Sequence, residues 1–242
     1  MERDDARGTR PILSLAFDGG FTLHAKDIAP LLDQRGFVGS FYVCPMNVLD
    51  HAEAWSDVAT RHEIGAHPFF DFADEHGLLP ATDGPLIRGE LADFSMLVQD
   101  LGVSVKSFAY PLGTQAELTP LEAIVNETAR QMVEEALQAE VESRFETVRS
   151  ARIGVNDPAA VDAKRLRCYR ADTLSSDTLI GLVEIAIEHG SWLILSFSDE
   201  LGVVDMVALT RLLKFAESAR STLEIGSISR VAMSLARPKV QH

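Results

Sequence analysis

Short apolar runs alternate with segments of helical periodicity from one end of the chain to the other. The runs expected to form strands are residues 11–17, 38–43, 62–66, 105–109, 145–153, 192–197 and 223–225. The segments expected to form helices are residues 28–32, 55–58, 91–101, 120–142, 176–189, 206–215 and 228–235. Strands and helices that alternate in this way indicate an α/β chain with a mainly parallel sheet or barrel, covered by helices.

Two residues mark the ends of the helix expected over 176–189. Ser176 is a residue type that caps helix N-termini through its hydroxyl. Gly190 is the residue type that most often follows a helix C-terminus. The pair therefore predicts a helix that starts at a serine cap and stops before the buried strand 192–197.

Length and composition predict a single domain. The chain has 242 residues, of which 46% are hydrophobic and 24% are charged. A chain of this size buries most of its surface in one core. The expected domain covers residues 11–236, between an N-terminal tail, residues 1–10, and a C-terminal tail, residues 237–242.

The formal net charge of −14 narrows the range of partners. Nucleic acid and anionic membranes attract basic surfaces, so neither is an expected partner. A neutral or cationic small molecule or glycan fits better, and no protein partner is implied.

The chain shows no targeting signal or cysteine framework. No apolar run reaches the roughly 18 residues that cross a bilayer, and residues 1–5 lack the order of a secretory signal. We therefore expect a cytoplasmic protein. Cys44 and Cys168 stand outside the spacings of a disulfide scaffold or a zinc site.

Three short strings combine chemistry-bearing residues with the ends of expected strands. They read Ala-Phe-Asp-Gly-Gly-Phe at 16–21, His-Glu-Ile-Gly-Ala-His-Pro-Phe-Phe-Asp at 62–71, and Phe-Ala-Tyr-Pro-Leu-Gly at 108–113. In barrels of alternating strands and helices, reactive groups gather at the carboxyl ends of the strands. Asp18, His67 and Tyr110 are therefore expected at one mouth.

The order of these strings resembles the NodB-homology domain of polysaccharide deacetylases, carbohydrate esterase family four. The resemblance covers about residues 11–235. Members of that family remove N- or O-acetyl groups from chitin oligomers, peptidoglycan and related glycans. The resemblance implies a single-domain, distorted (β/α) barrel with its site at the carboxyl ends of the strands.

The first two motifs of the family map onto this chain with two changes. Asp18 matches the aspartate that acts as general base, and Gly19 stands where the family has a metal-binding aspartate. His67 matches the first of two histidine ligands, and Asp71 occupies the position of the second. A carboxylate at Asp71 would shift preference from zinc toward harder metals.

The remaining motifs imply a groove, an arginine and a missing acid. Tyr110 and Pro111 belong to the string that resembles the groove wall, and Phe69 and Phe70 could stack on a sugar ring or form part of the core. Residues 148–156 resemble the stretch with an arginine that orients the catalytic aspartate. Of the two arginines in this stretch, Arg149 is a better match than Arg152.

Ser198 stands where the family has a histidine that acts as general acid. A serine hydroxyl does not exchange protons near neutral pH, so Ser198 cannot take over that role. Hydrolysis of an amide by a metal-bound water needs a cation, a base and an acid. Only the base, Asp18, is unchanged.

A divalent metal such as zinc, cobalt or manganese is the implied cofactor, held by His67 and Asp71. Catalytic sites usually supply three protein ligands, so this set would bind a metal weakly. Substitute donors near the motifs are His24, His62, His76, Asp74 and Glu75. Each is an ordinary surface or loop residue in the simpler interpretation.

Three functions remain open. The first is a hydrolase of carbon–nitrogen bonds other than peptide bonds, acting on an N-acylated sugar or a small amide. The second is a pseudoenzyme that binds a glycan or small ligand without turning it over. The third is a metal-free reaction on a non-sugar substrate, in which Asp18 transfers a proton.

Overall fold

The computed structural model describes residues 10–49, 51–68, 101–110, 139–198 and 204–236. Within these ranges the strands are β1 Ile12–Gly19, β2 Ser40–Val43, β3 Glu63–Ala66, β4 Ser107–Ala109, β5 Thr147–Ile153, β6 Leu166–Arg170, β7 Trp192–Ser198 and β8 Glu224–Ile225. The helices are η1 His24–Ile28, α1 Ala29–Asp33, α2 Pro45–Leu49, α3 Ala52–Ala59, α6 Ser176–His189, α7 Met206–Ser218 and α8 Ile228–Ala236. The alternation expected from the hydrophobic pattern is confirmed.

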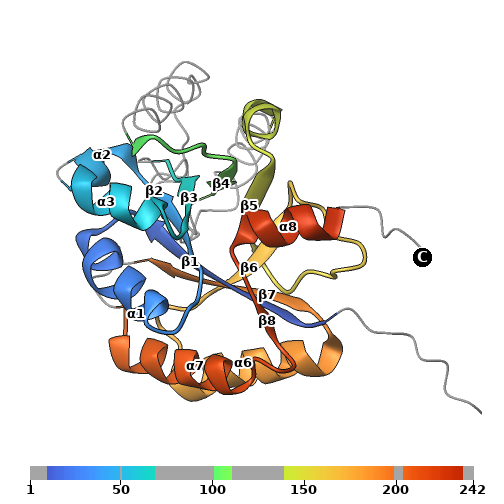
Figure 1. The fold of residues 1–242 in the computed structure, drawn as a ribbon. Helices are drawn as coiled ribbons and strands as arrows, with labels where there is room; N and C mark the ends of the chain where they lie inside the picture. The colour runs from blue at the N-terminus through green and yellow to red at the C-terminus, as the bar shows by residue number, and fades with distance from the viewer. Residues whose placement is uncertain (1–9, 50, 69–100, 111–138, 199–203, 237–242) are drawn as a thin grey trace, which may run out of the picture.

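The first seven strands form a closed, all-parallel barrel (Figure 1). They follow the order β2-β3-β4-β5-β6-β7-β1, and a further pairing between β1 and β2 closes the ring. The short β8 pairs with the first two residues of β1, where Ile12 lies opposite Glu224. The chain therefore forms the distorted barrel that its motifs imply, in a single α/β domain.

Side-chain alternation along β1 separates two apolar cores. Leu13, Leu15 and Phe17 belong to the larger cluster, which lies between the barrel and the surrounding helices. Ile12 and Ala16 belong to a smaller cluster inside the barrel. Every side chain of β1 is buried, as expected of a central strand with neighbours on both faces.

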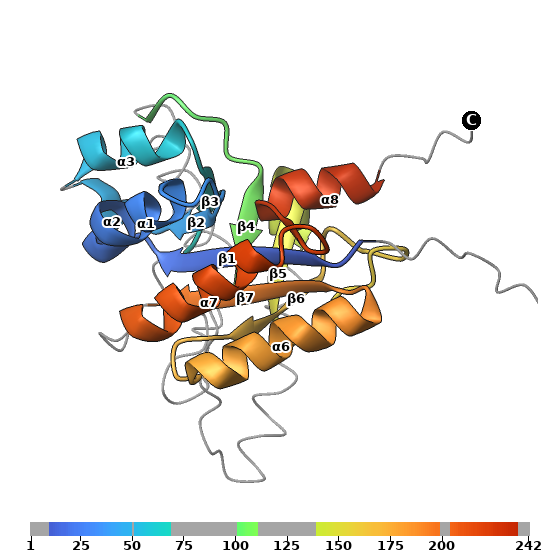
Figure 2. The same cartoon turned by 60° about the horizontal axis from the view of Figure 1, so that its bottom comes forward.

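Helices α6 and α7 lie side by side on one side of the barrel, beside β7 and β1 (Figures 1 and 2). α6 begins after Ser175, whose hydroxyl accepts the N–H of Thr178, and ends at Gly190 in the left-handed conformation with φ 62°. The cap predicted at Ser176 is therefore wrong by one residue, because Ser175 has the extended backbone that a capping residue needs. The predicted stop at Gly190 is confirmed.

Helix α8 closes the end of the barrel at which the strands begin. Its Ile228 and Val231 join the cluster of apolar side chains in the barrel interior. Glu63, at the start of β3, accepts hydrogen bonds from the backbone N–H and the hydroxyl of Ser229, at 3.0 and 2.6 Å. With this end closed, the carboxyl ends of the strands form the opposite mouth.

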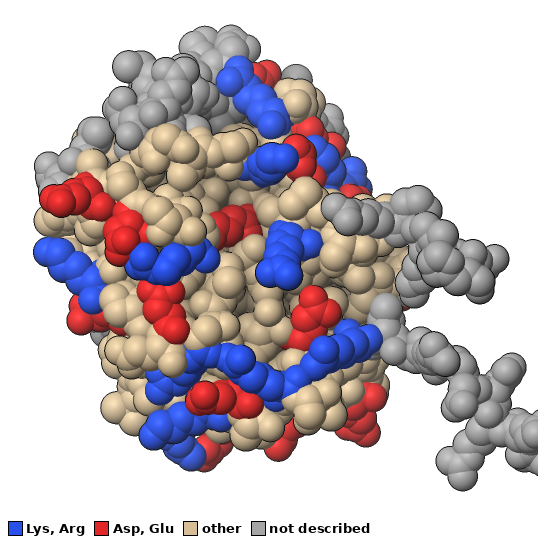
Figure 3. All heavy atoms as spheres, viewed as in Figure 1, with Lys and Arg blue, Asp and Glu red and all other residues tan. Residues whose placement is uncertain are grey.

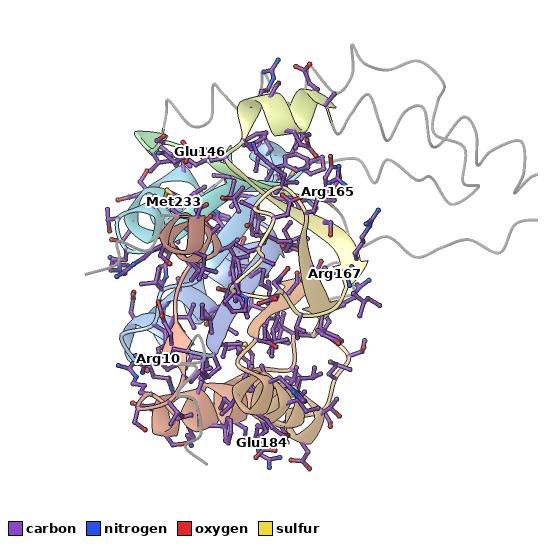
Figure 4. The ribbon with its side chains drawn as sticks, turned by 90° about the vertical axis from the view of Figure 1, so that its right-hand side faces the viewer. Arg10, Glu146, Arg165, Arg167, Glu184 and Met233 are labelled. Atoms are coloured by element: carbon purple, nitrogen blue, oxygen red, sulfur yellow. The ribbon has the colours of Figure 1, made fainter. Side chains whose placement is uncertain are left out.

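Within the described ranges, α2, β6 and all but the last residue of η1 were not predicted from the sequence. β6 has a buried face at Leu166 and Cys168, but an exposed arginine, Arg167, lies between them. Figure 4 shows the side chain of Arg167 at the surface. The helices predicted over 91–101 and 120–142 lie mainly outside the described residues. Of these two ranges, the structure describes only Leu101 and residues 139–142, which are helical.

On the face shown in Figure 3, the acidic side chains of the described residues do not form one continuous patch. Lys and Arg side chains lie among the Asp and Glu side chains of this face (Figure 3). None of the helices in the described ranges is long and apolar enough to cross a membrane.

Candidate active site at the barrel mouth

Asp18 lies near the carboxyl end of β1, on the strand face that points into the barrel. Its predecessor Phe17 packs in the outer core, so alternation along the strand turns Asp18 inward. Asp18 is only 2% exposed. A carboxylate this deeply buried needs charge-balancing partners, and the barrel interior supplies them.

Arg149 and Ser196 hold one oxygen of the Asp18 carboxylate. Nη2 of Arg149, from β5, donates to Oδ2 of Asp18 at 2.5 Å. The hydroxyl of Ser196, from β7, donates to the same oxygen at 2.6 Å. The other oxygen, Oδ1, is buried and has no hydrogen-bond partner among the described residues. One oxygen is therefore fixed, and the other keeps its lone pairs for a ligand or a proton.

The guanidinium of Arg149 is itself enclosed on several sides. Nη1 donates to Sγ of Cys168 at 3.2 Å, and the guanidinium carbon lies 5.4 Å from the ring centroid of Tyr42. Burial is the largest influence and acts to lower the pKa of Arg149, but the charge of Asp18 together with the interactions with Cys168 and Tyr42 outweighs it, and the net pKa is raised. Arg149 therefore stays cationic, and the aromatic face adds a cation–π contact.

Tyr42 and Cys168 are neutral neighbours of this ion pair. Burial raises the pKa of the Tyr42 phenol, and the charge of Glu63 raises it further. Burial also raises the pKa of the Cys168 thiol, although Arg149 opposes this effect. Neither side chain competes with Asp18 as a charged partner of Arg149.

His67 lies just beyond β3 at the same mouth. Its backbone N–H donates to the carbonyl of Val43 at 3.0 Å, which continues the pairing of β2 with β3. Glu63 and His67 are four residues apart on one strand path, so both face the interior. Nδ1 of His67 lies 2.8 Å from the carbonyl oxygen of Pro68. A carbonyl only accepts, so Nδ1 carries the hydrogen and the lone pair of the neutral ring is on Nε2.

The described residues alone do not make up the metal centre that the resemblance implies, and one implied ligand, Asp71, lies outside them. They contain no group of three His, Cys, Asp or Glu side chains placed to hold an ion. At Gly19, the φ of 101° is one that side chains rarely adopt, and an added Cβ would come 2.3 Å from the ring of Phe21. Phe21 thus fills the space next to Asp18 in which a second carboxylate would begin. We assign no step to a metal.

Of the other residues expected at the mouth, the structure describes Tyr110 and Ser198. The ring of Tyr110 packs edge-on against Phe108, with centroids 5.1 Å apart, and its backbone carbonyl lies 3.5 Å from Nη2 of Arg149. Ser198 ends β7 directly opposite Asp18 in the β1–β7 register and is buried. Four expected residues lie outside the described part of the chain, namely Phe69, Phe70, Asp71 and Pro111.

Two histidines considered as substitute donors lie away from the mouth. His24, on η1, is fully buried against the rings of Phe17 and Phe21 on the outer side of β1. His62 accepts the N–H of Gly39 on Nδ1 and places Nε2 3.1 Å from Asp33. Both therefore serve the outer core. The third, His76, and the carboxylates Asp74 and Glu75 fall in a range that the structure leaves undescribed.

Asp172 is a residue of the mouth that the sequence analysis missed. It follows β6 by two residues, its carboxylate is buried, and its Oδ1 accepts the backbone N–H of Ser198. The rule that polar residues at the carboxyl ends of strands form the site would have identified Asp172. That rule could not be applied because β6 itself was not recognised.

No protein-family model matches the sequence, and the search of curated proteins found no match. Solved structures with the same fold were found. One is from Mycobacterium smegmatis and is described as a polysaccharide deacetylase, with 13% identity, a TM-score of 0.63 and 98% of each chain covered.

Two further solved structures have the same fold. The Bc1960 peptidoglycan N-acetylglucosamine deacetylase, in complex with 4-naphthalen-1-yl-N-oxidanyl-benzamide, has 15% identity, a TM-score of 0.58, and coverage of 93% of this chain and 89% of its own. A family 4 acetyl xylan esterase from Clostridium thermocellum, in complex with a cobalt ion, has 18% identity, a TM-score of 0.56, and coverage of 94% and 93%. The chain therefore has the fold of the polysaccharide deacetylases and family 4 carbohydrate esterases, as its motifs suggested.

Proposed function

We propose that this protein hydrolyses a carbon–nitrogen bond other than a peptide bond, and that it removes the acyl group from an N-acylated amino sugar or a smaller amide. The observation that supports this most directly is the state of Asp18. Its Oδ2 is held by Arg149 and Ser196, while its buried Oδ1 has no hydrogen-bond partner in the described part of the chain. The fold shared with deacetylases supports the same reaction class.

In this proposal Asp18 is the general base. Oδ1 accepts a proton from the water molecule that attacks the acyl carbon. The cation of Arg149 and the hydroxyl of Ser196 keep the carboxylate in one orientation, so that Oδ1 faces the mouth in each cycle. A fixed carboxylate avoids reorganisation during the reaction, which is the main benefit of a preorganised site.

A second candidate function is ligand binding without turnover. The observation that favours it is the position of Phe21, whose ring occupies the space beside Gly19. The donor set is therefore incomplete within the described ranges, and Ser198 supplies no acid. In this alternative the Asp18 carboxylate would accept a hydrogen bond from a hydroxyl or amide of the ligand.

Acetate release distinguishes the two functions. The purified full-length chain is incubated with N-acetylglucosamine oligomers, without added metal and with zinc, cobalt or manganese. The hydrolase predicts acetate release that Asp18→Asn abolishes. Asp27→Asn is the matched control, because Asp27 is exposed on η1 and undergoes the same chemical change. Saturable oligomer binding with no acetate release under any condition would reject the hydrolase in favour of the binding protein.

Because Asp18→Asn also leaves the Arg149 cation unpaired, a folding check accompanies the assay. Circular dichroism and the midpoint of urea unfolding are measured for every variant. Ser196→Ala provides a milder change, since it removes one hydrogen bond to Oδ2 and leaves the ion pair in place. The proposal expects reduced acetate release from Ser196→Ala in a protein that is still folded.

A further inference from the structure

No residue in the described part of the chain has yet been assigned as proton donor to the departing nitrogen in the proposed hydrolysis. An amine is a poor leaving group unless it receives a proton as the carbon–nitrogen bond breaks. Ser198 stands at the end of β7 where the resemblance implies an acid, and its hydroxyl cannot supply a proton near neutral pH. A second carboxyl group at the mouth, that of Asp172, has no role in the proposed function so far.

Asp172 and Asp18 both lie next to Ser198, at the end of β7. The backbone N–H of Ser198 donates to Oδ1 of Asp172, and Nε of Arg170 donates to Oδ2 at 3.0 Å. Ser198 is also the register partner of Asp18. The two carboxyl groups therefore flank the end of β7, with Asp18 on β1 and Asp172 just beyond β6, at the edge where the mouth opens.

The two carboxyl groups have different surroundings. Asp18 is paired with the Arg149 cation and accepts the hydroxyl of Ser196. Burial raises the pKa of Asp172, the N–H of Ser198 and the guanidinium of Arg170 oppose this shift, and the charge of Asp18 adds to it. Two carboxyl groups held in contrasting environments at one site are the usual arrangement for a base and an acid.

Building on the proposed function, we infer that Asp172 donates the proton to the departing nitrogen and so takes the place of the acid missing at Ser198. Each oxygen of a carboxyl group has two lone pairs, so Asp172 can carry a proton while both of its observed hydrogen bonds remain.

The step balances without any further reactant. The water oxygen bonds to the acyl carbon, Asp18 takes one proton from that water, the carbon–nitrogen bond breaks, and the nitrogen takes the proton of Asp172. Exchange with solvent then restores both groups.

The test compares two substrates whose leaving groups differ in their need for a proton. N-Acetylglucosamine oligomers release an amine, whereas 4-nitrophenyl acetate releases a phenolate that is stable without a proton. For Asp172→Asn we expect kcat/KM on the amide to fall by about 10²- to 10⁴-fold, the usual contribution of a general acid. We expect kcat/KM on the ester to change far less.

Two controls separate proton donation from a structural role. Asp177→Asn makes the same change on a side chain that is 82% exposed in the first turn of α6, and both substrates should then be hydrolysed at the wild-type rate. In the wild type, the amide rate should fall as the pH rises through the pKa of Asp172, and this limb should be absent from the residual amide rate of Asp172→Asn. An equal loss on both substrates, or an unchanged amide rate, would overturn the inference.

The outcome also shows which of the two proposals fails. A wild-type protein that hydrolyses the amide while Asp172→Asn does so equally well rejects the acid alone. A wild-type protein inactive on both substrates rejects the proposed function and the acid with it. A carbon-13 titration of the carboxyl groups needs no turnover: the signal lost in Asp172→Asn should titrate above about 3.9, the ordinary aspartate value, and a lower value would overturn the inference.

Discussion

Arg149 and Asp18 form a buried ion pair, with Nη2 and Oδ2 2.5 Å apart, although 131 positions separate them in the sequence. The two residues come from β5 and β1, which are not neighbours in the barrel. The contact therefore crosses the barrel interior, where the side chains are 0% and 2% exposed. Each charge is acceptable there only because of the other.

Replacing Arg149 should therefore destabilise the fold strongly. Arg149→Met keeps much of the side-chain volume but leaves the Asp18 carboxylate buried without its cation. We expect the free energy of unfolding to fall by about 3–5 kcal/mol, as is usual when one partner of a buried pair is removed. Urea unfolding followed by circular dichroism measures the change.

A surface arginine on the same strand gives the control. Arg152 is exposed on β5, and Arg152→Met should change the unfolding free energy by no more than about 0.5 kcal/mol. The double variant Asp18→Asn with Arg149→Met should cost less than the sum of the two single changes, because the residues are directly coupled. Strict additivity would contradict the pairing.

Restoring the carboxylate that the resemblance expects at position 19 should damage the protein. Gly19→Asp places a side chain on a backbone with φ 101° and drives its Cβ to 2.3 Å from the ring of Phe21. We expect a loss of more than about 1–3 kcal/mol, the range for backbone strain alone. Gly102→Asp is the control, because φ is 67° there and no atom lies within 4 Å of an added Cβ.

The combination with a smaller residue at position 21 shows which term dominates. In Gly19→Asp with Phe21→Ala, the overlap is gone, while the backbone strain and the loss of the Phe21 contact with His24 remain, so part of the stability should return relative to Gly19→Asp. The stabilities of the wild type, Gly19→Asp, Gly102→Asp and the double variant are compared by thermal unfolding. If Gly19→Asp and Gly102→Asp lose the same stability, the overlap with Phe21 plays no part.

The contrast between Asp18 and Asp172 shows how far the sequence alone could predict this site. Asp18 follows an apolar run broken only by Ser14, so its strand, its position at the mouth and its motif could all be recognised from the sequence. Asp172 follows a strand whose exposed face carries Arg167, and that strand was missed. Its contact with the backbone of Ser198 depends on how β6 pairs with β7, which no local pattern specifies.

Gly19 shows a second limit of sequence reasoning. The sequence reveals that a carboxylate is absent at this position, but it does not reveal what fills the space. The ring of Phe21 reaches back over Gly19 because of the turn that follows β1, where both Gly19 and Gly20 have positive φ. The alternation of apolar runs and helices predicted a parallel sheet or barrel without such detail, and the family resemblance implied the barrel.

Glu63 should stabilise the closed end of the barrel. Its carboxylate accepts hydrogen bonds from the hydroxyls of Ser40 and Ser107, at 2.9 and 2.5 Å, and from the N–H and hydroxyl of Ser229 at the start of α8. Glu63→Gln keeps one acceptor oxygen and turns the other into a donor that faces these groups. We expect a loss of about 1–3 kcal/mol in unfolding free energy.

The control for this change is Glu224→Gln, because Glu224 is exposed on β8. Its replacement should leave the unfolding free energy within about 0.5 kcal/mol of the wild type. Hydrogen exchange of α8 gives an independent measurement, since weaker attachment of its first turn should speed the exchange of its amides. Unchanged stability and exchange in Glu63→Gln would show that the serines find other partners.

His24 should make the protein sensitive to acid. Both ring nitrogens are buried without a hydrogen-bond partner within the described ranges. Burial lowers the pKa of His24 from 6.5 to about 4, although the charge of Asp18 acts in the opposite direction. In the unfolded chain the ring takes up a proton near its ordinary pKa, so between pH 6.5 and 4 the unfolded state binds more protons than the folded state. Stability is therefore retained above pH 6.5 and falls as the pH decreases through this window.

The expected loss attributable to His24 is about 3 kcal/mol at pH 4, because its pKa falls from 6.5 to about 4 and each tenfold change in proton affinity is worth about 1.4 kcal/mol. His24→Phe keeps a buried ring among Phe17 and Phe21 but has no group to protonate, so its unfolding free energy should depend less on pH. Some dependence should remain, because burial also lowers the pKa of His62. His189→Gln, at an exposed position near the end of α6, should keep the full wild-type dependence. Parallel curves for wild type and His24→Phe between pH 6.5 and 4 would show that His24 is protonated in the folded protein, and that its surroundings are more polar than the packing indicates.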